Sequence, residues 1–167
     1  MKRILLFTVT LMFISNTITA QESVKINRIE WATCNVGESG TFVENPEDFG
    51  ILYPFEEAQK VCPDGWRTPT TDEFISLIRS GSNYVFINDI GGIKFGSGKN
   101  TIFLPAAGYN HNNSNGIRSL GRAGHYWSSE MVNSSLGFSL YFDGETVKPN
   151  DFSRSQPDDL SVRYVRK

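Results

Sequence analysis

Apolar and polar residues alternate through the first regular segment of the chain, residues 24–31, which reads VKINRIEW. This alternation is typical of a single β-strand with one buried face. The next stretch, 37–50, is polar and contains a proline, so it predicts a loop. Helical spacing of apolar residues then predicts a short helix that begins near Pro54 and ends at Cys62-Pro63-Asp64-Gly65.

A second helix has clear start and stop signals. Thr70 and Glu73 have the spacing of a capping box, in which each side chain binds the backbone N–H of the other residue. Gly81 predicts the end of this helix. Its apolar stripe consists of Phe74, Leu77 and Ile78.

No convincing helical pattern follows the second helix. Short apolar runs separated by Gly, Asn and Pro predict strands at 84–87, 93–95, 101–104, 126–128, 138–142 and 160–166. The segment 105–124 stands apart, because it holds four glycines and four asparagines with almost no apolar periodicity. A loop of this length in a compact domain is usually functional or disordered. Tyr109, Ile117 and Leu120 offer apolar groups that could hold it against the rest of the domain.

The N-terminus predicts a cleaved secretory signal peptide over residues 1–20. Lys2 and Arg3 precede a short apolar run, and small polar residues follow it and end on Ala20. The alternative is a buried N-terminal element of the mature fold, but such an element would not be headed by two basic residues and followed by a polar stretch. We therefore expect an exported protein, in the periplasm, at the cell surface or outside the cell. Its mature part, residues 21–167, has the size of one domain.

Charge and hydropathy argue against a nucleic-acid binder and against a membrane-spanning segment. The formal net charge is −2 and there is no basic run, whereas a nucleic-acid binder normally presents a basic field to the phosphates. No later segment is long and apolar enough to predict a membrane span. The 13% aromatic residues and 15 glycines favour a loop-rich α+β or all-β domain over a helical bundle.

The chain has two cysteines, Cys34 and Cys62. In an exported protein an even pair most often forms one disulfide, which stabilises the fold by restricting the unfolded chain. The competing interpretation is a free nucleophilic cysteine, although no histidine lies near either one in the sequence. We expect the disulfide.

Several short motifs together resemble a known family. In chain order they are WATCNVG at 31–37, CPDGWRTPT at 62–70, FLPAAGY at 103–109, YWSS at 126–129 and SVR at 161–163. This set resembles the Fibrobacter succinogenes major paralogous domain, which is abundant in secreted and surface proteins of Bacteroidetes-type bacteria. The resemblance extends from about residue 27 to residue 166, nearly the whole mature part.

The resemblance implies an α+β, C-type-lectin-like fold, in which two helices flank a small twisted antiparallel sheet and long loops carry the binding site. Two departures from related proteins matter. Many relatives have a cysteine in the last strand, where this chain has Tyr164. The related sulfatase-modifying enzymes need reactive cysteines near the C-terminus, and this chain has none after Cys62.

The recurring residues of the motifs are best explained as structural residues that fill or hold the core. Trp31, Trp66 and Trp127 are large enough to fill the core of a small sheet domain. Arg67 and Arg163 are able to hold backbone carbonyls or carboxylates by forked hydrogen bonds.

The sequence carries no recognisable catalytic or metal-binding pattern. His111 and His125 lack the spacing of metal ligands, and Ser128-Ser129 lacks the Gly-x-Ser-x-Gly context of a serine hydrolase. Gln156-Pro157-Asp158 matches a tripeptide with which galactose-type C-type lectins hold calcium and sugar. The Trp-Asn-Asp segment that those lectins also need is missing, so we interpret the tripeptide as a turn. We expect no enzyme activity, no cofactor and no need for calcium.

The favoured function is a non-catalytic recognition module that binds a glycan or a protein ligand through the loop 105–124. Its asparagines donate and accept hydrogen bonds, Tyr109 offers a stacking face and Arg118 offers a planar fork. The alternatives are a structural or adhesive subunit of a bacterial surface assembly, and a solvated loop that binds nothing. The predicted binding residues are Tyr109, Asn110, His111, Asn112, Asn113, Asn115, Arg118, Tyr126 and Arg154.

Overall fold

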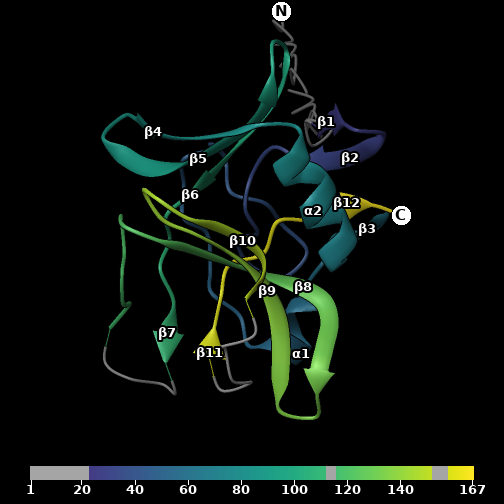
Figure 1. The fold of residues 1–167 in the computed structure, drawn as a ribbon. Helices are drawn as coiled ribbons and strands as arrows, with labels where there is room; N and C mark the ends of the chain where they lie inside the picture. Colours follow the sequence, from purple (N-terminus) through teal and green to yellow (C-terminus); the bar gives the residue numbers. More distant parts are fainter. Residues whose placement is uncertain (1–22, 112–115, 152–157) are drawn as a thin grey trace, which may run out of the picture.

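The computed structural model of the chain describes residues 23–111, 116–151 and 158–167, which form mostly short antiparallel strands together with two helices (Figure 1). The predicted signal peptide lies outside the described residues. The N-terminal strands and the longer helix lie at one end of the molecule in Figure 1, and the shorter helix lies at the opposite end.

The strand predicted over 24–31 is wrong, because the segment forms a hairpin of β1 (Ser23–Ile26) and β2 (Ile29–Ala32). Asn27 and Arg28 form its two-residue turn, with φ of 49° and 71°. Such turns require positive φ at both central residues, and Asn adopts this conformation readily. Two adjacent polar residues, Asn27 and Arg28, shift the phase of the alternation at this point, and the single-strand prediction overlooked that break.

The N-terminal hairpin belongs to a sheet with the order β1-β2-β12-β3. β12 (Val165–Arg166) lies between β2 and β3 (Trp66–Arg67), and Val165 faces both Trp31 and Arg67 across the ladders. The strand predicted over 160–166 is therefore correct only at its end. Earlier in that segment, Leu160 and Ser161 make isolated bridges to Tyr53 and Tyr126.

The helix predicted at Pro54 is much shorter than expected. α1 spans only Phe55–Ala58, with Pro54 as its N-cap residue. The backbone N–H of Lys60 bonds to the carbonyl of Glu57 and begins a tight turn. The proline that follows Cys62 disfavours helical geometry for the residue before it, so the helix cannot extend as far as the cysteine.

The second helix is confirmed. α2 (Thr71–Arg79) has Thr70 as its N-cap residue with both bonds of the capping box, and it buries Phe74 and Leu77. Its end is close to the predicted one, with Ser80 as the C-cap residue and Gly81 at a φ of 97°.

Five of the six predicted downstream strands lie inside observed strands, which form two three-stranded antiparallel sheets. The sheet β4-β5-β6 contains β4 (Ser82–Ile87), β5 (Ile90–Ser97) and β6 (Asn100–Pro105). The sheet β8-β9-β10 contains β8 (Gly124–Asn133), β9 (Leu136–Phe142) and β10 (Val147–Asp151). A separate ribbon pairs β7 (Asn110–His111) with β11 (Asp158–Asp159). β10 and the ribbon were not predicted.

The α+β, C-type-lectin-like fold implied by the resemblance is wrong for this structure. The two helices contain only four and nine residues. In the part of the chain that the structure describes, the strands divide among four small antiparallel sheets, so no single sheet lies between two helices. The short strands between glycine- and asparagine-rich turns produce this mostly β architecture, which the composition had allowed as an alternative.

The three tryptophans fill the interior as predicted. Trp31 and Trp127 are fully buried and Trp66 is nearly so. Trp31 lies in one core cluster, against Phe74 of α2, while Trp66 and Trp127 belong to a second cluster around α1. The ring of Trp127 meets Phe55 edge to face at 5.3 Å, and its indole N–H donates to the carbonyl of Tyr53.

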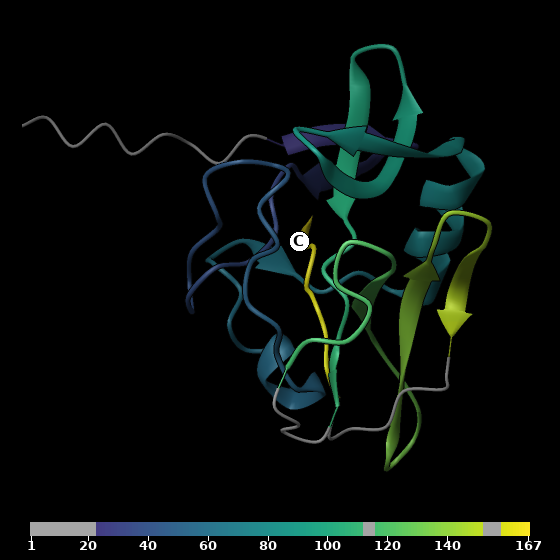
Figure 2. The ribbon, with the colours of Figure 1, turned by 90° about the vertical axis from the view of Figure 1, so that its left-hand side faces the viewer.

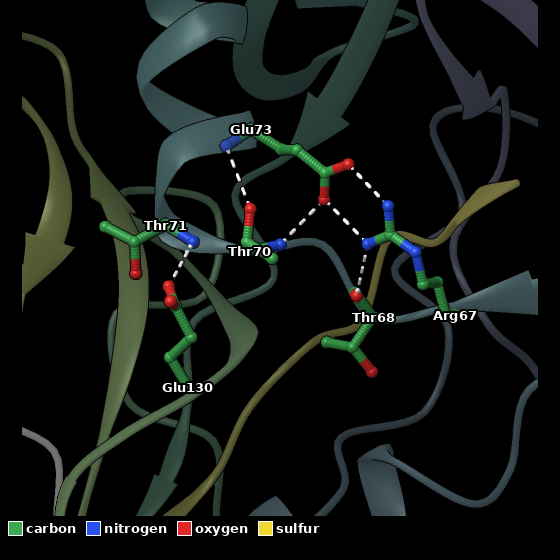
Figure 3. A network of polar contacts seen from close by, with 6 residues as sticks. All are labelled: Arg67, Thr68, Thr70, Thr71, Glu73 and Glu130. Atoms are coloured by element: carbon green, nitrogen blue, oxygen red, sulfur yellow. Dashed lines mark hydrogen bonds and ion pairs between the residues drawn. The ribbon is translucent and has the colours of Figure 1, made fainter. Parts of the chain in front are cut away.

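Arg67 and Arg163 both form the expected forks. Figure 3 shows Arg67 with its two terminal nitrogens on the two oxygens of Glu73, at 2.8 and 2.6 Å. Glu73 also accepts from the backbone N–H of Thr70, and Glu130 of β8 accepts from the backbone N–H of Thr71. These carboxylates therefore satisfy the first amide groups of α2, where the helix dipole favours negative charge.

Arg163 is completely buried and joins distant parts of the chain. Its guanidinium donates twice to Asn35 Oδ1, at 2.9 and 2.7 Å, and to the carbonyls of Ala32, Thr33 and Phe103. Burial lowers the pKa of Arg163. The cation is thus held by carbonyl and amide dipoles from two segments that precede it by 60 to 131 residues.

Candidate functional site

The β7–β11 ribbon joins the segment predicted to bind with the tripeptide that resembled a lectin motif. His111 lies opposite Asp158 in the ladder, and its Nδ1 is 2.5 Å from Asp158 Oδ1. Asn110 lies opposite Asp159, and its Nδ2 donates to Asp159 Oδ2 at 3.2 Å. Two cross-strand polar pairs therefore lie side by side on a ribbon that is only two residues long.

Exposure differs sharply within the first pair. The side chain of His111 is 46% exposed, whereas that of Asp158 is 3% exposed. The buried carboxylate orients the imidazole from one side, because a ring nitrogen that bonds to a fixed acceptor is held in one orientation. The free edge of the His111 ring remains available to solvent or to a ligand.

Tyr109 anchors the start of the ribbon. Its backbone N–H and carbonyl exchange hydrogen bonds with Arg118, at 3.0 and 2.8 Å, which closes the loop between them. Its half-buried ring meets the buried ring of His125 edge to face at 5.1 Å. His125 in turn packs on Tyr141 at 4.9 Å. Residues 105–111 and 116–124 are therefore held together by backbone pairing, and Tyr109 packs on the ring of His125.

α1 lies next to the ribbon at the same end of the molecule (Figure 1). Tyr53 and Leu160 exchange backbone hydrogen bonds of 2.9 and 3.0 Å, which aligns the residues before α1 with β11. A surface cavity of about 220 Å³ is lined there by Pro54, Phe55, Glu56 and Glu57.

Several carboxylates share this end of the molecule. Burial raises the pKa of Asp159, and the nearby charges of Asp158 and Glu57 raise it further, whereas the hydrogen bond from Asn110 acts in the opposite direction. Asp159 therefore holds its negative charge less firmly than a solvated aspartate. The local field is acidic, so it disfavours anionic ligands.

The structure separates the predicted binding residues into three groups. Tyr109, Asn110 and His111 lie together on or beside the ribbon, and Arg118 is exposed next to Tyr109. Asn112, Asn113, Asn115 and Arg154 lie outside the described residues, as do Gln156 and Pro157.

The prediction that Tyr126 has an exposed edge is wrong, because this side chain is fully buried. Its hydroxyl donates to the carbonyl of Pro105 at 2.8 Å and accepts from Asn35 Nδ2 at 3.0 Å. Burial raises the pKa of Tyr126 to about 12. It belongs to the buried polar network around Arg163, and a ligand at the surface cannot reach it.

The predicted disulfide is absent, because Cys34 and Cys62 are both free. The buried Cys34 thiol lies 3.8 Å from the carbonyl of Glu44, and the half-buried Cys62 thiol lies 3.9 Å from the carbonyl of Gln59. Each thiol thus contacts backbone in its own loop. The even count and the expectation of export were not sufficient to place the two residues together.

The sequence contains only one sign of the partners that complete the ribbon. Asp158 was noticed only as part of a turn, and Asp159 and Glu57 were not selected. His111 and Asp158 are 47 residues apart, and nothing in the hydrophobic pattern indicates that they pair. The resemblance of Gln156-Pro157-Asp158 to a lectin tripeptide was the one signal that pointed to this position.

The described contacts do not place His125 beside Ser128 as a catalytic Ser–His pair would require. Ser128 Oγ exchanges bonds with the backbone of Glu130, and the ring of His125 packs between Tyr109 and Tyr141. Among residues 23–111, 116–151 and 158–167, no three His, Cys, Asp or Glu side chains are placed to hold a metal ion. No helix in those ranges is long and apolar enough to cross a membrane.

Comparison with known proteins found no match among family models, curated proteins or solved structures. The resemblance to the Fibrobacter succinogenes major paralogous domain therefore rests on the short motifs alone. The function has to be argued from the chemistry of the ribbon and its surroundings.

Proposed function

We propose that this protein is an exported, non-catalytic recognition module that binds a neutral, hydroxyl-rich ligand, a glycan in the first instance, at the β7–β11 ribbon. The observation that carries the proposal is the pair of cross-strand contacts, His111 with Asp158 and Asn110 with Asp159. Imidazole, amide and carboxylate groups together offer both donors and acceptors, as sugar hydroxyls require.

The surroundings of the ribbon support a sugar rather than a flat protein surface. The cavity beside α1 is concave and has an apolar wall in Phe55, while Glu56 and Glu57 provide acceptors. Small-molecule sites combine an apolar lining with a few polar groups in this way. The acidic field selects against sulfated, phosphorylated or uronic-acid sugars.

Rigidity also supports binding at this place. The backbone pairs of Tyr109 with Arg118 and of Tyr53 with Leu160 hold both sides of the ribbon. A ligand therefore meets side chains that are already oriented, which reduces the entropy lost on binding.

Calorimetric titration of the protein with neutral oligosaccharides, chosen from a glycan array, tests the proposal. Asn110→Ala together with Asp159→Asn removes one cross-strand pair, and we expect affinity to fall about tenfold or more. Asn100→Ala is the matched control, because Asn100 is an exposed asparagine on a different hairpin. Equal affinity in the double variant and the control would place the site elsewhere. If no oligosaccharide binds and the protein binds a protein partner equally well after the partner's glycans are removed, a glycan ligand is excluded.

A further inference from the structure

β4 is the outermost strand of the sheet β4-β5-β6 and has one free edge. Ile87 and Ile90 close a two-residue turn at Asn88 and Asp89, whose φ values are 47° and 64°. The closing pair of such a turn is hydrogen-bonded, and bonded and non-bonded pairs alternate along the hairpin. The N–H and carbonyl groups of Tyr84 and Phe86 therefore face away from β5.

No backbone group among the described residues pairs with this outer edge of β4. Proteins normally protect such an edge with a charged side chain, a proline or a bulge, because an open edge attracts another strand. β4 reads SNYVFI, so it contains no charge and no proline, and its register with β5 is continuous over all six pairs. The absence of protection indicates an edge that is used for pairing.

Phe86 is the most exposed large apolar residue in the described part of the chain, at 71%. It lies opposite Gly91 in the ladder and meets Tyr84 edge to face at 5.8 Å. The hydroxyl of Tyr84 donates to the carbonyl of Gly121, in the loop that lies beneath the β4–β5 hairpin in Figure 2. That loop also exposes Ile117 and Leu120, so apolar surface continues from the edge of the sheet onto the loop.

We propose that β4 pairs antiparallel with β4 of a second copy of this chain, so that two three-stranded sheets become one six-stranded sheet. Unpaired main-chain donors and acceptors in a row select an extended strand as the occupant. A two-fold axis at Val85 places Phe86 of each copy opposite Tyr84 of the other, and aromatic cross-strand pairs stabilise a sheet.

Charge favours a second copy over an unrelated peptide. β4 itself has no charged side chain, so the two paired strands meet without like-charge repulsion between them. The charges beside β4 include Asp143 and Glu145 of the β9–β10 turn, which line a groove with Ser82, Asn83 and Tyr84. β4 itself lies at the other end of the molecule from the β7–β11 ribbon (Figure 1), so the strand pairing and the glycan site are tested by different residues, although the loop with Ile117 and Leu120 also carries Arg118, which pairs with Tyr109.

Sedimentation equilibrium of the whole protein over a concentration series tests the pairing. We expect a reversible dimer, and we expect Phe86→Lys to raise its dissociation constant about tenfold or more, as for an aromatic residue at the centre of an interface. The lysine has room because Phe86 is exposed in the single chain, and an unchanged thermal melt at low concentration confirms that the variant folds. Met131→Lys is the control, because Met131 is an exposed apolar residue on the β8–β9 hairpin, and dimerisation should be unchanged.

Hydrogen exchange provides the second measurement. In the dimer the amide hydrogens of Tyr84 and Phe86 should be protected at high concentration and exchange quickly on dilution or in Phe86→Lys. A monomer at every concentration, or a dimer that persists unchanged in Phe86→Lys, would overturn the proposal. Protection that arises only when an unrelated extended peptide is added would also overturn it and would assign the edge to a different protein.

Discussion

Replacing the buried Arg163 by methionine should be among the most damaging single changes in this protein. Methionine fills much of the same space without the guanidinium. The substitution removes all five hydrogen bonds of the side chain and leaves four acceptors, the carbonyls of Ala32, Thr33 and Phe103 and the Asn35 amide oxygen, without that donor. A buried polar group that loses its partner costs about 1–3 kcal/mol.

These costs do not add fully, because the four acceptors share one donor group and water enters the space that is left. The desolvation of the charge is also relieved, which offsets part of the loss. We therefore expect the free energy of unfolding to fall by about 3–5 kcal/mol, well below the full sum of about 1–3 kcal/mol for each of the four acceptors. That is a large share of the roughly 5–15 kcal/mol that a domain typically has.

Urea unfolding followed by tryptophan fluorescence measures this change. Arg166→Met is the matched control, because the Arg166 guanidinium lies on the surface of the Trp66 ring, at 4.1 Å, and should contribute only about 1 kcal/mol. Arg163→Lys should be nearly as damaging as the methionine variant, since an ammonium group cannot reproduce the fork. If Arg163→Met unfolds at the same urea concentration as Arg166→Met, the buried Arg163 network contributes no more stability than the surface Arg166 contact.

Three further predictions concern local structure. Thr70→Ala removes the cap of α2 and should lower the free energy of unfolding by about 1 kcal/mol in urea titrations, and an unchanged midpoint would contradict this. Burial raises the pKa of Glu73, but the hydrogen bonds from Arg67 and Thr70 outweigh burial, so the folded-state pKa is lowered. The stability that Glu73 contributes is therefore present above its unfolded-state pKa and is lost as the pH falls through its folded-state pKa. Glu73→Gln should therefore flatten the loss of stability between about pH 5 and pH 3, and an unchanged slope would exclude this carboxylate as its source. Gly50→Ala should lower the free energy of unfolding by about 3 kcal/mol or more, because φ is 73° and a Cβ would lie 2.3 Å from the carbonyl oxygen of Val36. Gly40 has a similar φ of 79° but no atom within 4 Å of a Cβ, so Gly40→Ala should lower it by only about 1–2 kcal/mol.

Local signals in the sequence predicted local structure well. The capping box at Thr70 and Glu73 located α2 to within a residue, because both bonds form between neighbours in the chain. Short apolar runs between turn residues located β4, β5, β6, β8 and β9 for the same reason. The burial of the three tryptophans followed from their size alone.

Features set by contacts between distant residues were not predictable in this way. The turn at Asn27 and Arg28 is a different case, because two adjacent polar residues shift the alternation there and the prediction overlooked that break. The ribbon was hidden because each of its strands has only two residues, too few to show a period. Tyr126 was assigned to the binding surface, whereas the structure buries it completely and joins its hydroxyl to Asn35, 91 residues away.

The position of β12 between β2 and β3 determines when this fold can be completed. Synthesis delivers the N-terminal hairpin first, but the neighbour that pairs with β2 and the arginine that holds Ala32 arrive 131 residues later. Contacts of such long sequence separation slow folding, since a long stretch of chain must be ordered before they form. Until then, Trp31 and the rest of the first core cluster have no complete cover. The interval before β12 arrives is therefore when the exposed part of this cluster most favours aggregation.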